Sequence, residues 1–143
     1  MHQQIKASPD TVAENIRAVV DSLASAGINI ESISPDFDPP HVRVLVKHDV
    51  FDDAFTALQN ANLEPTIVRS VDPVQIPNKP GALRTAMDTL EGQGHTIESI
   101  LVLAGRGNDT EVSFGVAGDV DNDWPNEAES LMALIQTEIG NLP

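Results

Sequence analysis

Two segments of the chain, 67 residues apart, carry apolar residues at the three- and four-residue spacing of an amphipathic helix face. The apolar positions are Ile16, Val19, Val20 and Leu23 in the first segment and Leu83, Ala86, Met87 and Leu90 in the second. Each run ends at a glycine, Gly27 or Gly94, a residue that commonly terminates a helix in the left-handed conformation. An isoleucine-containing strand is predicted after each glycine.

The two segments are copies of one another. Residues 17–33 (RAVVDSLASAGINIESI) and 84–100 (RTAMDTLEGQGHTIESI) are identical at eight of 17 positions. The identical pairs are Arg17/Arg84, Asp21/Asp88, Leu23/Leu90, Gly27/Gly94, Ile30/Ile97, Glu31/Glu98, Ser32/Ser99 and Ile33/Ile100. An internal repeat of this length predicts two structural units of the same type.

The rest of each half follows a common plan. In the first half we predict a turn-rich loop at 34–40, a strand at 41–48, a helix capped by Asp49 with Phe51, Ala54, Phe55 and Leu58 on its buried face, and a strand at 65–71. In the second half we predict strands at 74–77, 95–104 and 112–116, a hairpin turn at 105–108, and a last helix that buries Ala128, Leu131, Ile135 and Ile139.

Each half thus has the strand–helix–strand–strand–helix–strand order of a ferredoxin-like βαββαβ unit. We predict an α+β protein of two such repeats, residues 1–71 and 72–143, each an antiparallel sheet with helices on one face. Repeats this small should pack on each other. The second repeat has no room for its last strand after Gly140, so we expect residues 65–71, or a strand of another chain, to cover the edge beside its first strand.

Residues 100–103 (ILVL) are apolar on both faces of their predicted strand. The helices cover one face, and we expect the other to meet the partner repeat or a second subunit. The alternative is a locally hydrophobic edge without further consequence.

The amino-acid composition argues against several classes of function. The chain has 22 acidic and 8 basic residues and a formal net charge of −14, which argues against nucleic-acid binding, since phosphate contacts need clustered lysine and arginine. The aspartate-rich, lysine-poor balance resembles proteins of salt-loving archaea and predicts destabilisation at low salt; an ordinary solvated acidic surface is the alternative. The absence of cysteine excludes disulfides and thiolate chemistry. No segment resembles a membrane span or signal peptide, so we expect a cytoplasmic protein.

The segment at 76–83 (IPNKPGAL) is a candidate ligand site. Pro80 presets the first turn of a helix, and Gly81 lets a ligand approach the backbone, whose free N–H groups there suit a carboxylate or phosphate. Asn78 can donate and accept hydrogen bonds, and Lys79 adds positive charge. The candidate ligand residues are Asn78, Lys79, Pro80, Gly81, Ala82 and Leu83. On these residues alone, an ordinary helix start explains the segment as well.

The wording NKPGAL, followed by MDTLEGQGHTIESI, resembles the ligand loop of the ACT domain family, in which an acidic residue or Asn before Pro-Gly opens the first helix. The resemblance covers residues 72–116 well and 4–71 more loosely. It implies regulatory domains that pair side by side and bind an amino acid between them. The loop of one domain holds the carboxylate, and the second strand of its neighbour holds the amine. Carried over, the strand contacts are Asn29 and Ile30, or Thr96 and Ile97 if two second repeats pair.

The first repeat departs from this motif. Residues 11–14 (TVAE) align with 78–81, so Glu14 stands at the position of Gly81. A ligand carboxylate would meet a side chain and a like charge there. We therefore expect one ligand site per chain.

Other constellations are assigned structural roles. The four histidines are scattered, although His95 could neighbour the ligand interface. Residues 119–123 (DVDND) look like the start of a calcium loop but lack its glycine and glutamate, so we interpret them as helix-capping acids. Asp36 and Asp38 could pair as carboxylates, with no nucleophile or base placed beside them. Trp124 is predicted to be a packing anchor.

The sequence thus predicts a non-catalytic regulatory protein that binds an amino acid at an interface between ACT-like domains. We expect no metal or cofactor, a homodimer or larger assembly, and an output through a partner enzyme, a transcription factor or the assembly itself. We expect no direct contact with nucleic acid or membrane. Two alternatives stay open: a ligand-free dimerisation or docking module, and a small enzyme on a ferredoxin-like fold, which lacks an evident acid–base pair.

Overall fold

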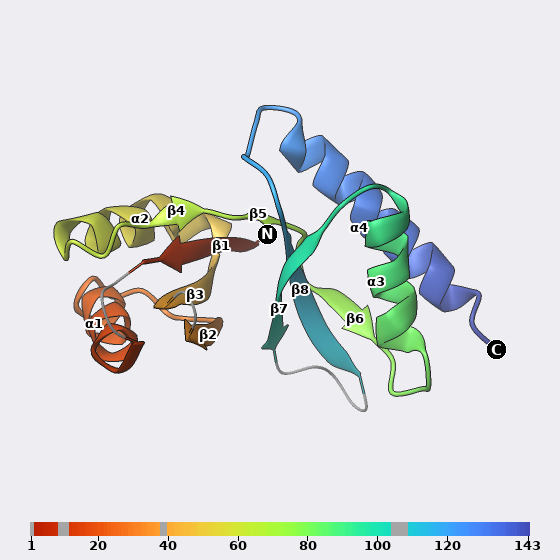
Figure 1. Ribbon diagram of the computed structural model, residues 1–143, viewed down its shortest axis with the longest axis horizontal. Helices are drawn as coiled ribbons and strands as arrows, with labels where there is room; N and C mark the ends of the chain where they lie inside the picture. The colour runs from red at the N-terminus through yellow and green to blue at the C-terminus, as the bar shows by residue number, and fades with distance from the viewer. Residues whose placement is uncertain (1, 9–11, 38–39, 104–108) are drawn as a thin grey trace. The chain divides into compact units, whose positions relative to one another are not determined.

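The computed structural model describes residues 2–8, 12–37, 40–103 and 109–143. The chain divides into two compact units, an N-terminal unit (Met1–Val68) and a C-terminal unit (Arg69–Pro143). Each unit contains one antiparallel sheet and two α-helices (Figure 1).

The N-terminal unit has the strand order β2-β3-β1-β4, with every neighbouring pair antiparallel. Its elements are β1 (His2–Ala7), α1 (Val12–Ser25), β2 (Ser32–Phe37), β3 (Pro40–Lys47), the 3-10 helix η1 (His48–Val50), α2 (Phe51–Asn60) and β4 (Thr66–Ile67). Alternate residues of β3, Val42, Val44 and Val46, are fully buried in the same cluster as Leu23 of α1 and Leu58 of α2. The two helices therefore cover one face of this sheet.

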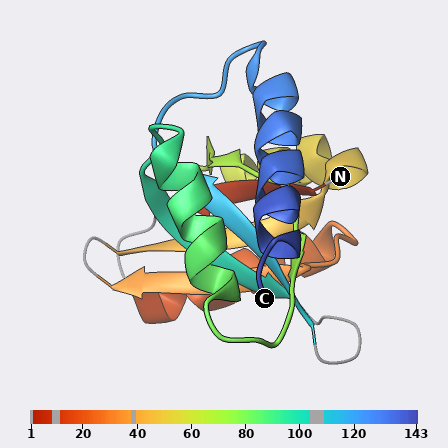
Figure 2. The same cartoon turned by 90° about the vertical axis from the view of Figure 1, so that its right-hand side faces the viewer.

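The C-terminal unit repeats this design. Its elements are β5 (Arg69–Ser70), β6 (Val74–Ile76), α3 (Ala82–Gly92), β7 (Ile97–Leu103), β8 (Thr110–Val116) and α4 (Trp124–Gly140). Strand β8 pairs with β7 on one side and with β5 and β6 on the other. Phe114 of β8 is fully buried in one cluster with Leu90 of α3 and Ile135 of α4. Helices α3 and α4 lie side by side on this sheet (Figures 1 and 2).

The fold class predicted from the sequence is confirmed: the chain is an α+β protein built from two antiparallel sheets with helices packed against them. Both predicted helix stops are also confirmed. Gly27 and Gly94 follow their helices with φ of +73° and +87°, the left-handed conformation that glycine adopts at low cost.

Two local predictions in the N-terminal unit are wrong. Residues 34–37, predicted as loop, belong to β2, where Pro35 pairs with Val42 of β3. A proline is tolerated because β2 is an edge strand of its sheet. Asp49 does not cap the second helix; it lies within η1, and the N-cap of α2 is Val50, which makes no side-chain capping bond.

The segment at 65–71 forms two short strands instead of one. Strand β4 pairs with β1 in the N-terminal sheet, whereas β5 pairs with Gly115 and Val116 of β8 in the C-terminal sheet. One of our expectations was that residues 65–71 cover the outer edge of β6. This expectation is wrong, because β5 lies along β8 instead. Among the described residues β6 has β8 as its only strand partner, and those after α4 form no strand.

Strand β7 is apolar on both faces, as its sequence indicated. Ile100 packs against the core of the C-terminal unit, Leu101 is buried, and the Val102 side chain is 56% exposed. The predicted hairpin turn at 105–108 lies outside the described residues. None of the described helices is long and apolar enough to cross a membrane.

Candidate functional site

The loop between β6 and α3 contains the predicted ligand residues. The Lys79 N–H donates to the Pro77 carbonyl (2.8 Å), and the Ala82 N–H donates to the Lys79 carbonyl (3.3 Å). Gly81 is the N-cap of α3, has a φ of +83°, and makes no side-chain capping bond. The chain therefore turns tightly into the helix, at a point where a residue with a β-carbon would be strained.

The outer side of this turn is open. A β-carbon placed on Gly81 would meet no atom of the described residues within 4 Å. Among the described residues, neither the Gly81 nor the Leu83 amide has a backbone acceptor, as expected for the first turn of a helix. Asn78 and Lys79 are exposed beside them. Two amides, a carboxamide and an ammonium group are thus available to an anionic group.

One predicted contact needs correction. We expected the amide of Ala82 to be free for a ligand, but it is already bonded to the carbonyl of Lys79. The Ala82 side chain is also 1% exposed and belongs to the core. Ala82 therefore anchors the loop to the sheet, and the ligand-facing amides that remain are those of Gly81 and Leu83.

A groove of about 480 Å³ adjoins the loop (the loop groove). It is lined by Ile76, Pro77, Asn78, Lys79, Leu83, Ile100, Val102, Thr110 and Val112. Its wall is largely aliphatic, and Leu83 and Val102 are 41% and 56% exposed. Asn78, Lys79 and Thr110 add polar groups to this lining, so the groove can take a small molecule that carries both an anionic group and an apolar part.

A second groove of about 890 Å³ lies at the start of β7 (the strand groove). It is lined by Met87, Glu91, Gly94, His95, Thr96, Ile97, Glu98, Ser99 and Ile100. Both predicted strand contacts, Thr96 and Ile97, line it. Ile100 lines both grooves, so they adjoin one another along β7. Strand β7 pairs with β8 alone among the described strands and is the edge of its sheet.

The other pair of predicted contacts lies outside any described strand, as does Thr96, which directly precedes β7. Asn29 and Ile30 precede β2, which begins at Ser32. The Asn29 side-chain amide donates to the Glu31 carboxylate (3.4 Å). The prediction that Glu14 blocks a ligand in the first repeat concerns side chains that the structure does not describe. Thr11 and the side chains of residues 12–15 lie outside the described part of the chain.

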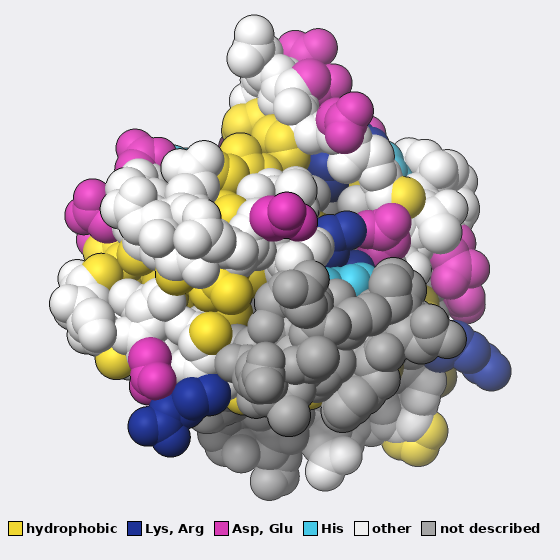
Figure 3. Space-filling model, turned by 60° about the vertical axis from the view of Figure 1, so that its left-hand side comes forward, with side chains coloured by type: hydrophobic (Ala, Val, Ile, Leu, Met, Phe, Trp, Pro, Cys, Tyr) yellow, Lys and Arg dark blue, Asp and Glu magenta, His cyan; other side chains and the backbone are white. Residues whose placement is uncertain are grey.

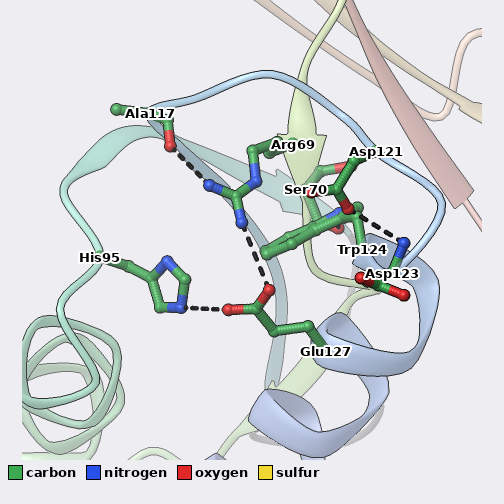
Figure 4. Close-up of polar contacts among 8 residues, drawn as sticks. All are labelled: Arg69, Ser70, His95, Ala117, Asp121, Asp123, Trp124 and Glu127. Carbon is green, nitrogen blue, oxygen red and sulfur yellow. Dashed lines mark hydrogen bonds and ion pairs between the residues drawn. The ribbon is translucent and has the colours of Figure 1, made fainter.

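A cluster of polar and aromatic side chains, drawn in Figure 4, adjoins the strand groove at His95. The Arg69 guanidinium lies 4.2 Å from the centre of the Trp124 ring and donates to the Ala117 carbonyl (3.1 Å) and to the Glu127 carboxylate (3.4 Å). The other oxygen of Glu127 lies 3.1 Å from Nε2 of His95. This cluster connects β5, α4 and the residue before the predicted contact Thr96.

Sequence reasoning identified only part of this cluster. Trp124 is 3% exposed and packs in the core, which confirms its predicted role as an anchor. Arg69 and Glu127 were missed because they are 58 residues apart and belong to no motif. One difference between the repeats could have pointed to this cluster. His95 stands where the first repeat has Ile28, which is a buried apolar residue.

Charged groups elsewhere form structural ion pairs. Asp36 pairs with His41 and accepts a hydrogen bond from Arg43 Nε (3.2 Å). Its suggested partner Asp38 lies outside the described residues. No three His, Asp or Glu side chains of the described ranges gather in a metal-binding arrangement. Acidic side chains are spread over the face seen in Figure 3, where lysine and arginine appear at few places.

Comparison with solved structures places this fold. A protein of Bacteroides thetaiotaomicron matches with a TM-score of 0.68 and 18% identity, over 98% of this chain and 96% of that one. The ligand-free regulatory subunit of aspartate kinase from Thermus thermophilus matches with a TM-score of 0.63 and 19% identity, over 96% and 92%. The regulatory subunit from Thermus flavus matches with a TM-score of 0.58 and 21% identity, over the same shares.

No family model matches the sequence, and no curated protein matches it significantly. The structural likenesses are all below 25% identity, so they define the fold and not the ligand. The chain has an ACT-like fold, in agreement with the resemblance of its loop motif.

Proposed function

We propose that the protein is a non-catalytic regulator that binds an amino acid at the loop groove. The supporting observation is the turn at Gly81, where two amides have no backbone acceptor among the described residues and the same residues leave space open at the start of α3. Helix N-termini attract carboxylates because their N–H groups and dipole are both favourable. The exposed ammonium of Lys79 adds to this attraction in a chain with few cations.

The amine of the ligand needs acceptors, which the loop does not supply. In our proposal these come from the backbone around Thr96 and Ile97 of a second copy. Strand β7 is an edge strand, and edge strands of two copies can pair in antiparallel fashion. Such a pairing would bring the strand groove of one copy to the loop groove of the other. The site would be complete only in the dimer, with one site formed by each loop.

The output passes to another protein in this proposal. Two solved structures with this fold are named as regulatory subunits of aspartate kinase. That association favours a partner enzyme over a transcription factor as the receiver of the signal. Ligand and partner would influence one another by a coupling free energy of about 1–3 kcal/mol.

A ligand-free dimerisation module is the second candidate. The exposure of Leu83 and Val102 beside the sheet edge favours it, since apolar side chains at an edge support association without a ligand. The two candidates differ in whether an amino acid stabilises the protein.

A thermal-shift screen with the twenty amino acids at high salt tests the proposal. An amino acid present at about 100 times its Kd should stabilise the folded protein by about 2.7 kcal/mol. The matched variants are Gly81→Ala and Gly27→Ala, because both glycines have positive φ and open space around the added carbon. Both should lose similar stability, and only Gly81→Ala should lose the ligand-induced shift. Absence of any shift in the unsubstituted protein would exclude amino-acid regulation and favour the dimerisation module.

A further inference from the structure

Arg69 is the first residue of the C-terminal unit, and its side-chain contacts within the described ranges are with that unit. The residue before it, Val68, is held by the N-terminal unit: its N–H donates to the Gln4 carbonyl (3.1 Å), and its carbonyl accepts from the Gln3 side chain (2.7 Å). The chain thus passes from one unit to the other between consecutive residues, with no linker between them.

Two short chains of contacts lead from the strand groove to Arg69. In the first, the Ala117 N–H donates to the Thr96 carbonyl (2.9 Å), and the Ala117 carbonyl accepts from Arg69 Nη1 (3.1 Å). In the second, Nε2 of His95 contacts one oxygen of Glu127 (3.1 Å), and Arg69 Nη2 donates to the other (3.4 Å). Thr96 and His95 both line the strand groove.

The neighbouring residue is tied to the same cluster. The Trp124 indole Nε1 donates to the Ser70 carbonyl (3.1 Å), while its ring lies under the Arg69 guanidinium. His95 contacts the same ring edge-on, with the ring centres 5.9 Å apart. A movement of residues 95–96 would therefore alter the contacts of both residues of β5.

The position of Arg69 is crowded and incompletely satisfied. A β-carbon at Gly118 would lie 2.5 Å from Arg69 Nη1. The buried Nε of Arg69 has no hydrogen-bond partner in the described part of the chain. An unsatisfied buried donor raises the free energy of this arrangement, so a second arrangement of the guanidinium is within reach of a bound ligand.

We propose that Arg69 is a positioning residue through which occupancy of the strand groove sets the order of the segment joining the two units. This inference rests on the proposed function, because it needs a ligand at Thr96 and Ile97. The ligand steadies the loop at 94–97. The steadied loop fixes the Ala117 carbonyl and the Glu127 carboxylate, and these hold Arg69. The partner enzyme would then read the order of residues 66–72.

Hydrogen exchange measured by mass spectrometry tests this coupling. The probe is whichever of the twenty amino acids raises the Tm of the unsubstituted protein most. The readouts are the amides of Val68 and Val71, which donate to Gln4 and Phe114 on either side of Arg69. In the unsubstituted protein, the amino acid should slow exchange of both amides.

The Arg69→Met variant should lose this slowing while its Kd, from calorimetry, changes by less than about fivefold, the lower end of allosteric couplings. The matched control is Arg17→Met, which removes an arginine from an exposed ion pair with Asp21. If Arg69→Met does not fold, Glu127→Gln replaces it, because one of the two accepting oxygens of Glu127 then becomes an NH2 group, which cannot accept from Arg69 or His95.

The outcomes are separated by the ratio of the exchange rates of these amides with and without the bound amino acid. A purely structural Arg69 would speed exchange equally in both states and leave the ratio as in the unsubstituted protein, which would overturn the inference. Binding without slowed exchange in the unsubstituted protein would overturn it as well and leave the proposed function intact. If no amino acid raises the Tm, the proposed function fails and the coupling fails with it.

Discussion

The guanidinium of Arg69 lies over the indole ring of Trp124, 4.2 Å from its centre, and the indole N–H bonds to the carbonyl of the next residue, Ser70. A stacked arginine and an anchored tryptophan hold each other in place, since each restricts the rotamers of the other. Strand β5 is only two residues long, so these side-chain contacts, more than its ladder, attach it to the C-terminal unit.

Substitution of Gly118 tests how tightly this arrangement is packed. In Gly118→Ala the new carbon would lie 2.5 Å from Arg69 Nη1 and would sit at a φ of +118°. We expect a loss of about 1–3 kcal/mol in the free energy of unfolding, the usual cost of such strain. Chemical denaturation followed by circular dichroism measures it. Gly92→Ala in α3 is the control, with no atom near the added carbon, and should be neutral or slightly stabilising. Equal effects of the two substitutions would contradict the packing described.

Core substitutions at matched repeat positions should have matched costs. Leu23 and Leu90 are equivalent in the repeat and fully buried. Replacing either by alanine should cost about 2–5 kcal/mol, from lost burial and the cavity left behind. Val20, 37% exposed on α1, provides the control and should cost far less on substitution by alanine. Denaturant titration of the three variants checks this, and a cost for Val20→Ala as large as that for Leu23→Ala would argue against the helix face assigned here.

The sheet edge at β7 is predicted to carry the interface between copies. Val102 is 56% exposed, so Val102→Lys should change stability by no more than about 0.5 kcal/mol in the monomer. In a paired edge, the added charge would be desolvated between the two copies. We expect the sedimentation coefficient to fall to that of a monomer and amino-acid binding to weaken with it. Thr66→Lys on β4, at the edge of the other sheet, is the control. An unchanged assembly in Val102→Lys would place the interface elsewhere.

Salt should stabilise the protein. With a net charge of −14, repulsion between carboxylates opposes the compact state, and raising the salt from about 0.1 M to about 1 M shortens the Debye length from about 10 Å to about 3 Å. The Tm should rise over this range. Replacing the exposed acids Asp88, Glu129 and Glu138 with lysine takes the net charge from −14 to −8, since each replacement adds two charges, and should reduce the salt dependence. If the Tm of neither protein changes with salt, repulsion between carboxylates does not contribute substantially to stability.

Local patterns determined the parts of the fold that depend on a few neighbouring residues. Most of each helix face of α1 and α3, their glycine stops, and the anchoring of Trp124 could be predicted because periodicity and glycine conformation are short-range properties. Val20 and Leu83 were wrongly placed on the buried faces, since they are 37% and 41% exposed. The duplication itself established that the two units share one design, and the loop at 78–81 could be singled out because its turn chemistry is local as well.

Long-range pairing determined the rest. Residues 34–37 form a strand because they pair with β3 at the edge of the sheet, whereas their local propensity favours a loop. The division of 65–71 between two sheets follows from partners far along the chain. The contacts of Arg69 with Ala117 and Glu127 join residues 48 and 58 positions apart, so no spacing rule could have paired them. Sequence by itself determined which segments bury a face; only the tertiary structure decided which surfaces and charges those faces would meet.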